Sequence, residues 1–279
     1  MNITEIFGYG AEAATADAKA ARASRYCRFR DSACTKSSVT DPIGICSLSI
    51  DGEAASLCLV RFLEGGMIFK DAARLAFGVG ASFAVFPEVR ILQIDDPAHS
   101  GKPKKIGKVD FVLGAVSQGR IVDFAALEVQ AAYFSGLETR TALRHFIEHG
   151  HFGGHNVFRR PDFRSSAQKR LIPQLQLKVP VFRRWGKKFF VVVDTQFYRS
   201  LPTFRPTTVA NSELTWLVYP ILQIGKNFVM QDVQPVFSEW ADVENSLREG
   251  RAPDPAEIIA ELQLKLNIKG RNAPEIFEC

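Results

Sequence analysis

The sequence predicts a mixed α/β protein in which strands and helices follow one another in no regular order. Two strand patterns and one helical pattern lead to this expectation. The segment KKFFVVVDTQFY, residues 187–198, is a near-continuous run of β-branched and aromatic residues, typical of a strand buried on both faces. Two further strands, at 102–116 and 120–133, flank a turn at 117–119 and predict a hairpin. The segment LETRTALRHFIEH, residues 137–149, is helical.

The remaining elements follow from the same kinds of pattern. A helix is expected from about Gly65 to Phe77, because its apolar residues fall on one stripe. The segment VRILQIDDP at 89–97 is expected to be a short strand or loop. A basic helix at 164–178 contains Pro173, which should kink or end it. We also expect a strand at 212–224 and two C-terminal helices, at 242–249 and, after a Pro-Asp-Pro signal, at 254–266.

The composition excludes several classes of protein. Of the 279 residues, 46% are hydrophobic, which is too many for a disordered chain. No apolar run is long enough to cross a bilayer, so we expect no membrane partner. The N-terminus lacks the uninterrupted apolar stretch of a secretory signal. We therefore expect a cytoplasmic protein, whose cysteines stay reduced or bind metal.

Four of the five cysteines lie within one polar, turn-rich stretch of the chain, with the spacing C-x6-C-x11-C-x11-C. Four thiolates can hold a tetrahedral zinc ion or an iron ion. Two disulfides or four unrelated buried thiols are the alternatives, and the surrounding turn residues favour the metal, because such a segment buries little of its own. The site would be structural, since four protein ligands leave no position for a substrate. The expected ligands are Cys27, Cys34, Cys46 and Cys58.

The positive charge of the chain is concentrated in one stretch. There are 35 Lys and Arg against 30 Asp and Glu, a formal net charge of +5, and the basic residues cluster between residues 158 and 188. Local positive potential of this kind suits a phosphate backbone, although a solvated basic face explains the charge equally well. The candidates for contacts with nucleic acid are Lys169, Arg170, Arg183 and Arg184.

Two carboxylates on the expected hairpin form the candidate catalytic centre. Asp110 lies on the first strand and Glu128 on the second, with seventeen residues between them. Glu128 and Gln130 share a face, because side chains alternate along a strand. Paired acids on apolar strands are costly unless a cation lies between them, and Mg²⁺ suits that position because it prefers carboxylate oxygens. The alternative is a pair of ordinary acids on the wet face of a hairpin.

Several of these segments together resemble one family. The stretches are CRFRDSACTKSS, IGICSLS, LCLVRFLEGGMIF, IGKVDFVLG, ALEVQAAY and QKRLIPQLQLKVPVFRRWGKKFFVVVDTQFY. Over roughly residues 1–230 they are similar to the NotI-type restriction endonucleases. The resemblance implies a PD-(D/E)XK nuclease core, a mixed sheet flanked by helices, at 65–279, and a small N-terminal segment with a cysteine-coordinated metal at 1–64. It further implies a Mg²⁺-dependent type II enzyme that cuts specific sites in double-stranded DNA as a homodimer.

The resemblance also implies roles for single residues. It matches the four cysteines to a structural iron site, and Asp110, Glu128 and Gln130 to the catalytic centre. A further acid before Asp110 often serves such cores, and Glu88 is the candidate, with Asp95 behind it. Gln130 stands where the usual motif has lysine. Because an amide offers a dipole without a charge, the metal must carry more of the stabilisation.

Two further features leave other functions open. Four histidines fall within eleven residues and could bind a transition metal, but a glycine-rich helix end explains them equally well. Asp194 and Gln196 repeat the D-x-Q pattern and rank second as an acidic centre. The alternatives to a nuclease are a non-cleaving DNA-binding protein with a degenerate nuclease fold, and a metalloprotein built on the histidine cluster. The four histidines are His145, His149, His151 and His155.

Overall fold

The computed structural model describes residues 2–37, 44–50, 52–94, 104–132, 137–152, 161–248, 254–268, 274–275 and 277. The chain divides into two compact units, residues 1–247 and residues 248–279. The boundary expected between residues 64 and 65 falls inside the first unit, and the organisation into an N-terminal segment and a core stays a prediction.

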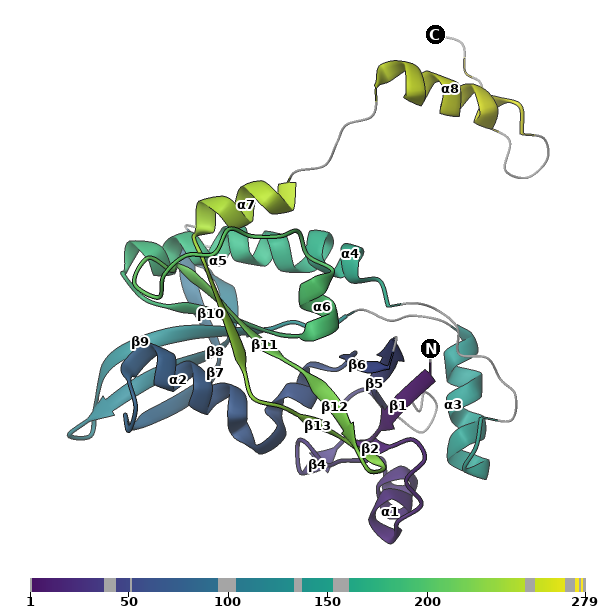
Figure 1. The fold of residues 1–279 in the computed structure, drawn as a ribbon, viewed down its shortest axis with the longest axis horizontal. Helices are drawn as coiled ribbons and strands as arrows, with labels where there is room; N and C mark the ends of the chain where they lie inside the picture. Colours follow the sequence, from purple (N-terminus) through teal and green to yellow (C-terminus); the bar gives the residue numbers. More distant parts are fainter. Residues whose placement is uncertain are drawn as a thin grey trace. The chain divides into compact units, whose positions relative to one another are not determined.

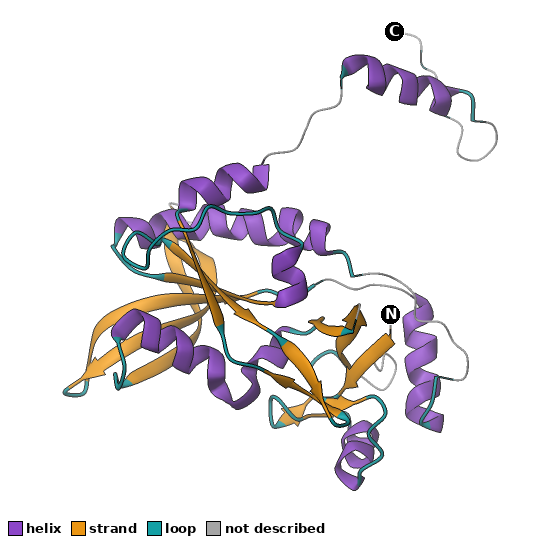
Figure 2. Ribbon diagram, in the orientation of Figure 1, coloured by secondary structure: helices purple, strands orange, loops and turns teal. Residues whose placement is uncertain are grey.

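A six-stranded mixed sheet forms the centre of the first unit (Figures 1 and 2). The strands β9, β10 and β11 run parallel, whereas β7, β8 and β14 pair antiparallel with their neighbours. The expected mixed α/β class is therefore confirmed. In spatial order the strands are β14 (Gln234–Ser238), β11 (Leu214–Tyr219), β10 (Phe189–Asp194), β9 (Arg120–Val129), β8 (Lys104–Ser117) and β7 (Phe83–Ile94).

The local strand predictions hold in the centre of the sheet. The expected hairpin is the antiparallel pair β8–β9, and its turn places Gln118 and Gly119 at positive φ, 48° and 74°. Two such residues in succession match the twist of the flanking strands. Every residue of β10 is buried, as its apolar run predicts, but residues 195–198, which were expected to continue the strand, belong to the helix α6 (Thr195–Arg199). The strand β7 is longer than expected, because β8 pairs along it from Phe83–Ala115 to Ile94–Lys104.

Helices cover both faces of this sheet. On one face lies α5 (Ile172–Arg184), whose buried side chains join those of β10 and β11 in the larger hydrophobic core. On the other face lies α2 (Met67–Phe77), which packs with β9 and the opposite side chains of β10 in a second core. Figure 1 shows the two helices on opposite sides of the strands. The central strands β10 and β11 are thus buried on both faces, as their continuous apolar runs require.

Pro173 does not end the basic helix. The chain is helical from α4 (Phe163–Ser166) through a π-helical turn, η2 (Ala167–Leu171), into α5. In this turn the Ile172 N–H donates to the Ala167 carbonyl, five residues back. Pro173 directly follows this π-helical turn, a local irregularity of the kind that often accompanies a proline within a helical stretch.

A four-stranded antiparallel sheet precedes the central sheet in the chain. The predicted elements did not include it, because its strands are short and the cysteine-containing turns separate them. A 3₁₀ helix, η1 (Leu59–Gly66), leads from it into α2. In spatial order its strands are β2 (Tyr9–Gly10), β1 (Asn2–Ile6), β5 (Ile45–Ile50) and β6 (Glu53–Ser56); a two-stranded pair, β3 (Tyr26–Cys27) and β4 (Ser32–Ala33), lies between β2 and β5 in sequence.

The remaining predicted elements are present with shifted bounds, whereas several short elements were not predicted. The strand expected at 212–224 divides at Pro220 into β11 and β12. In the second unit, Asp254 caps the N-terminus of α8 (Pro255–Leu266) by accepting from the Ala256 N–H. Within the described ranges, none of the helices is long and apolar enough to span a bilayer. The elements not yet named are α1 (Ala16–Ser24), α3 (Leu137–His149), β12 (Ile221–Ile224), β13 (Asn227–Met230) and α7 (Trp240–Arg248).

Candidate acidic centre

Asp110 and Glu128 meet where the β8–β9 ladder ends. The last backbone pair of the hairpin is Phe111 with Leu127, one step before the two acids. Beyond this pair, backbone N–H groups donate to the carboxylates of the two acids instead of to backbone carbonyls. The Asp110 N–H donates to Glu128 Oε1 at 3.3 Å, and the Val129 N–H donates to Asp110 Oδ2 at 3.0 Å. The hairpin therefore brings the two predicted carboxylates together, as their places on paired strands predict.

Lys178 completes this cluster from the covering helix. Its Nζ lies 2.6 Å from Glu128 Oε1 and 3.0 Å from Gln174 Oε1, and both charged side chains are 4% exposed. We did not predict this residue from the sequence. The signal was present, because Lys178 occupies a position on the apolar stripe of α5 together with Leu175, Val179 and Phe182, all of them buried.

The environment of Glu128 disfavours its ionised form. Burial is the largest cause, and the Asp110 charge adds to it, so the pKa of Glu128 rises to about 7 although Lys178 opposes the change. A carboxylate in this position gains from any further cation that enters the centre. Because Asp110 carries no ion pair within the described residues, the two acids exceed the single ammonium by one charge.

Gln130 follows Glu128 at the end of β9. Its backbone N–H donates to the Val192 carbonyl at 2.9 Å, which extends the pairing with β10 by one residue. The side-chain Nε2 donates to the Ala131 carbonyl at 2.7 Å, and the residue is buried. Its proposed part in catalysis stays a prediction, because the described hydrogen bonds do not join its amide to either carboxylate.

Glu88 lies on β7 directly across from Asp110. The pairs Pro87–Phe111 and Val89–Val109 flank it, and its φ is 57°, an unusual backbone conformation for a glutamate. Its carboxylate is exposed and pairs with Lys108 Nζ at 2.7 Å; this hydrogen bond lowers the pKa of Glu88. A role for Glu88 at the centre stays a prediction, and Asp95 lies outside the described residues.

The four basic candidates lie at two ends of one helical stretch. Lys169 and Arg170 are exposed on the π-helical turn η2, whereas Arg183 and Arg184 are in the last turn of α5. At 1.5 Å per residue the two pairs are about 20 Å apart along the axis. Arg183 forms an ion pair with Glu213, so part of its charge is already matched. Their contacts with nucleic acid stay a prediction.

The four cysteines lie around the four-stranded sheet. Cys27, Cys46 and Cys58 are buried and Cys34 is half-buried; all four are free thiols. Burial raises the pKa of Cys34 and of Cys46; the Glu5 carboxylate raises that of Cys46 further, and the thiols of Cys27 and Cys58 add to the rise at both. Among the described residues, however, no group of three or more His, Cys, Asp or Glu is arranged to hold a metal. The metal site stays a prediction.

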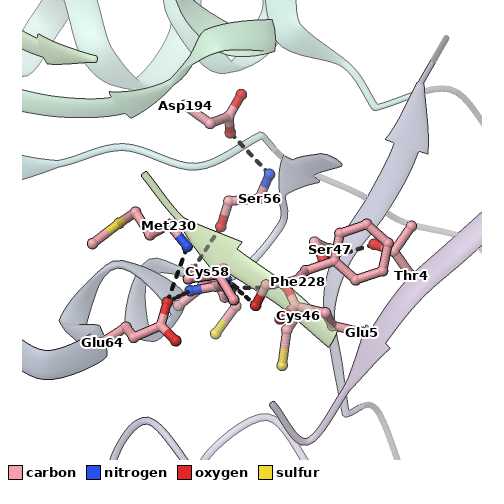
Figure 3. A network of polar contacts seen from close by, with 12 residues as sticks. Thr4, Glu5, Cys46, Ser47, Ser56, Cys58, Glu64, Asp194, Phe228 and Met230 are labelled. Atoms are coloured by element: carbon pink, nitrogen blue, oxygen red, sulfur yellow. Dashed lines mark hydrogen bonds and ion pairs between the residues drawn. The ribbon is translucent and has the colours of Figure 1, made fainter. Parts of the chain in front are cut away.

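The two alternative sites named from the sequence are the histidine cluster and Asp194. The rings of His145 and His149 lie 4.4 Å apart at the end of α3, with His151 5.1 Å from the first; His155 is outside the described residues. Asp194 is fully buried and caps α6, accepting from the Phe197 N–H at 2.8 Å and from the Ser56 N–H at 2.9 Å (Figure 3). A carboxylate with two backbone donors is a link between β10 and β6.

The structure is that of a mixed α/β protein in which a half-buried Asp110 and a buried Glu128 meet at the end of a hairpin ladder, beneath the helix α5. Residues 11–229 match the family model described as Restriction endonuclease NotI. The match covers most of the chain, so the chain belongs to this family of type II restriction endonucleases, which are site-specific nucleases that bind double-stranded DNA. The matched range includes the four clustered cysteines, both acids and Lys178. A search of curated proteins found no match.

Proposed function

We propose that this protein is a type II restriction endonuclease that hydrolyses phosphodiester bonds at specific sites in double-stranded DNA with Mg²⁺. The convergence of Asp110 and Glu128 from adjacent strands, in a chain of this family, carries the proposal. The mixed sheet with helices on both faces is compatible with a PD-(D/E)XK core. Two acids with one lysine leave room for a divalent cation, which fits the raised pKa of Glu128.

The free oxygens of the two acids suit a hard cation. Glu128 Oε1 already accepts from Lys178 and from the Asp110 N–H, and Asp110 Oδ2 accepts from the Val129 N–H. The other oxygens, Asp110 Oδ1 and Glu128 Oε2, are then the proposed ligands. A bound Mg²⁺ would supply a more acidic water and offset the charge that grows on the phosphate. Gln130 is proposed to orient the attacking water with its amide, while one P–O bond forms and another breaks.

The basic residues are proposed to hold the DNA backbone. Lys169 and Arg170 at one end, and Arg183 and Arg184 at the other, would contact phosphates at two points along the duplex. Neutralising Lys169 and Arg170 should weaken binding to every sequence and reduce its salt dependence. Loss of affinity for one sequence alone would instead make them base-reading residues. A symmetric homodimer acting on a palindromic site is part of the proposal.

We also propose that the four cysteines hold one structural iron or zinc ion. Their chemistry fits such an ion, since thiolates are the preferred ligands of both and all four cysteines are free thiols. Elemental analysis of the purified protein tests this, and a stable metal-free protein would contradict it.

Cleavage of DNA tests the proposed function directly. Wild-type protein with Mg²⁺ should cut unmethylated phage DNA into discrete fragments. Asp110→Asn keeps the shape of the side chain but removes one charge, so cleavage should fall by about 10²- to 10³-fold. The same variant should still bind, in Ca²⁺, a duplex that carries the mapped site. Absence of cutting by the wild type across metals and salt concentrations would favour a DNA-binding protein without nuclease activity.

A further inference from the structure

We propose that Lys178 supplies the fixed positive charge of the catalytic centre, as a positioning residue that acts through Glu128. This inference rests on the proposed nuclease function. The residue at the motif position, Gln130, has no charge to offer, and the described ion pairs of the centre involve Lys178 alone. Lys178, on the helix α5, would thus provide the positive charge that a lysine at the motif position would otherwise provide.

The burial of Lys178 is difficult to explain by stability alone. It sits on the stripe of α5 that packs on the sheet, where Leu175 and Val179 are fully buried beside it. A leucine or methionine would complete this stripe without the cost of removing an ammonium from water. Lys178 instead donates hydrogen bonds to Glu128 and to Gln174, which lies one turn back along α5.

The contact also fixes the direction of the Glu128 carboxylate. With Oε1 held by the ammonium at 2.6 Å and by the Asp110 N–H at 3.3 Å, Oε2 is left toward the proposed metal position. The ammonium offsets one of the two carboxylate charges, which lowers the repulsion that an incoming DNA phosphate meets. Because the charge is in place before the substrate arrives, it requires no reorganisation during the reaction.

A lysine introduced at position 130 can distinguish an electrostatic role of Lys178 from a packing role. Gln130 lies two residues after Glu128, just beyond the end of β9, where its N–H continues the pairing with β10; Gln130→Lys would therefore bring an ammonium toward the same carboxylate from a different element. If Lys178 matters as a charge, this second change should rescue a variant that lacks it. If Lys178 only fills space in the core, the second change should restore nothing.

The experiment uses the full chain and a duplex carrying the site that the wild type cuts. Lys178→Met should lower cleavage in Mg²⁺ by about 100-fold, with binding in Ca²⁺ within about threefold of the wild type. The double variant Lys178→Met/Gln130→Lys should recover at least about tenfold of the lost rate. Lys19→Met, at an exposed lysine of α1, is the matched control and should change neither measurement.

Should Lys178→Met fail to fold, Lys178→Gln takes its place, because glutamine can still donate to Glu128 but carries no charge. Cleavage within threefold of the wild type by a folded, uncharged variant would overturn the inference, and so would a double variant without recovery. These results leave the proposed nuclease function intact when the wild type cuts. A wild type that does not cut removes the function and the inference together.

Discussion

Two buried clusters of acids and cations differ in how completely their charges are matched. In the N-terminal cluster, Arg61 Nε donates to Glu5 Oε2 at 2.8 Å, and Nη1 donates to Glu64 Oε2 at 2.7 Å. A second cation, Arg28, lies 3.9 Å from Glu64, so two acids meet two cations. Figure 3 shows Glu5, Glu64 and the Phe228 carbonyl, which accepts from Arg61 at 3.0 Å, in this network.

The cluster beneath α5 is arranged differently. Lys178 alone faces Glu128, and the neighbouring Asp110 accepts a backbone N–H in place of an ion pair. Burial raises the pKa of an acid at both sites: that of Glu5, although Arg61 opposes the change, and that of Glu128, to about 7 with a further contribution from Asp110. In the matched cluster the neighbouring acids also raise the pKa of Arg61, against the effect of its burial. A matched cluster holds the fold together, and a cluster with one excess acid is suited to receive a cation.

The largest expected effect is on the matched cluster. Arg61→Met would leave Glu5 and Glu64 buried without their shared partner, so the free energy of unfolding should fall by about 3–5 kcal/mol. Arg28→Met, at the more exposed cation, should cost less than about 1 kcal/mol. Urea unfolding measures both. A small effect of Arg61→Met would remove the contrast, because the matched cluster would then not support the fold.

Asp194 is a third buried acid, and it differs from the acids of both clusters because its described hydrogen bonds come from backbone N–H groups. Burial raises the pKa of Asp194 from its ordinary value of 3.8 to about 6, against the two N–H donors that lower it. Between these pH values the folded state binds more protons than the unfolded state. The stability that Asp194 contributes is therefore full below pH 3.8 and falls as the pH rises toward 6, by up to about 3 kcal/mol.

Asp194→Asn tests this pH dependence. The variant should lose stability at acidic pH, where the wild-type carboxyl is protonated, and the wild-type advantage should shrink as the pH rises through the window. Urea unfolding at several pH values between about 4 and 7 gives both curves. Parallel curves for the two proteins would mean that the Asp194 carboxyl titrates alike in the folded and unfolded states.

The smallest expected effect is the stabilisation of the protein by a cation bound at Asp110 and Glu128. A divalent cation that binds the folded centre should stabilise the protein, by about 1.4 kcal/mol when its concentration is ten times Kd. Ca²⁺ should thus raise the melting temperature of the wild type but not that of Asp110→Asn. Arg28→Met, which leaves the centre intact, should respond like the wild type. Equal responses of the wild type and Asp110→Asn would place the cation elsewhere.

The hairpin and its two acids were determined locally. The turn at Gly119 sets the first pairs of the hairpin, Ser117–Arg120 and Val116–Ile121, and a bulge next to Ala115 then shifts the register by one residue, which brings Asp110 beside Glu128. The apolar run of β10 likewise predicts a strand with both faces covered. The hairpin and the buried strand depend on neighbours in sequence, so the pattern of residues is enough to predict them, whereas the bulge was not predicted.

The partners of these acids were decided by the tertiary structure. Lys178 is fifty residues from Glu128 and meets it only because α5 packs its apolar stripe on the sheet. Asp194 resembles a catalytic acid in sequence, but the chain turns into α6 directly after it and makes it a cap. Sequence patterns report which faces are apolar; which charged group lies opposite another depends on how the elements dock, and that contact carries no signal along the chain.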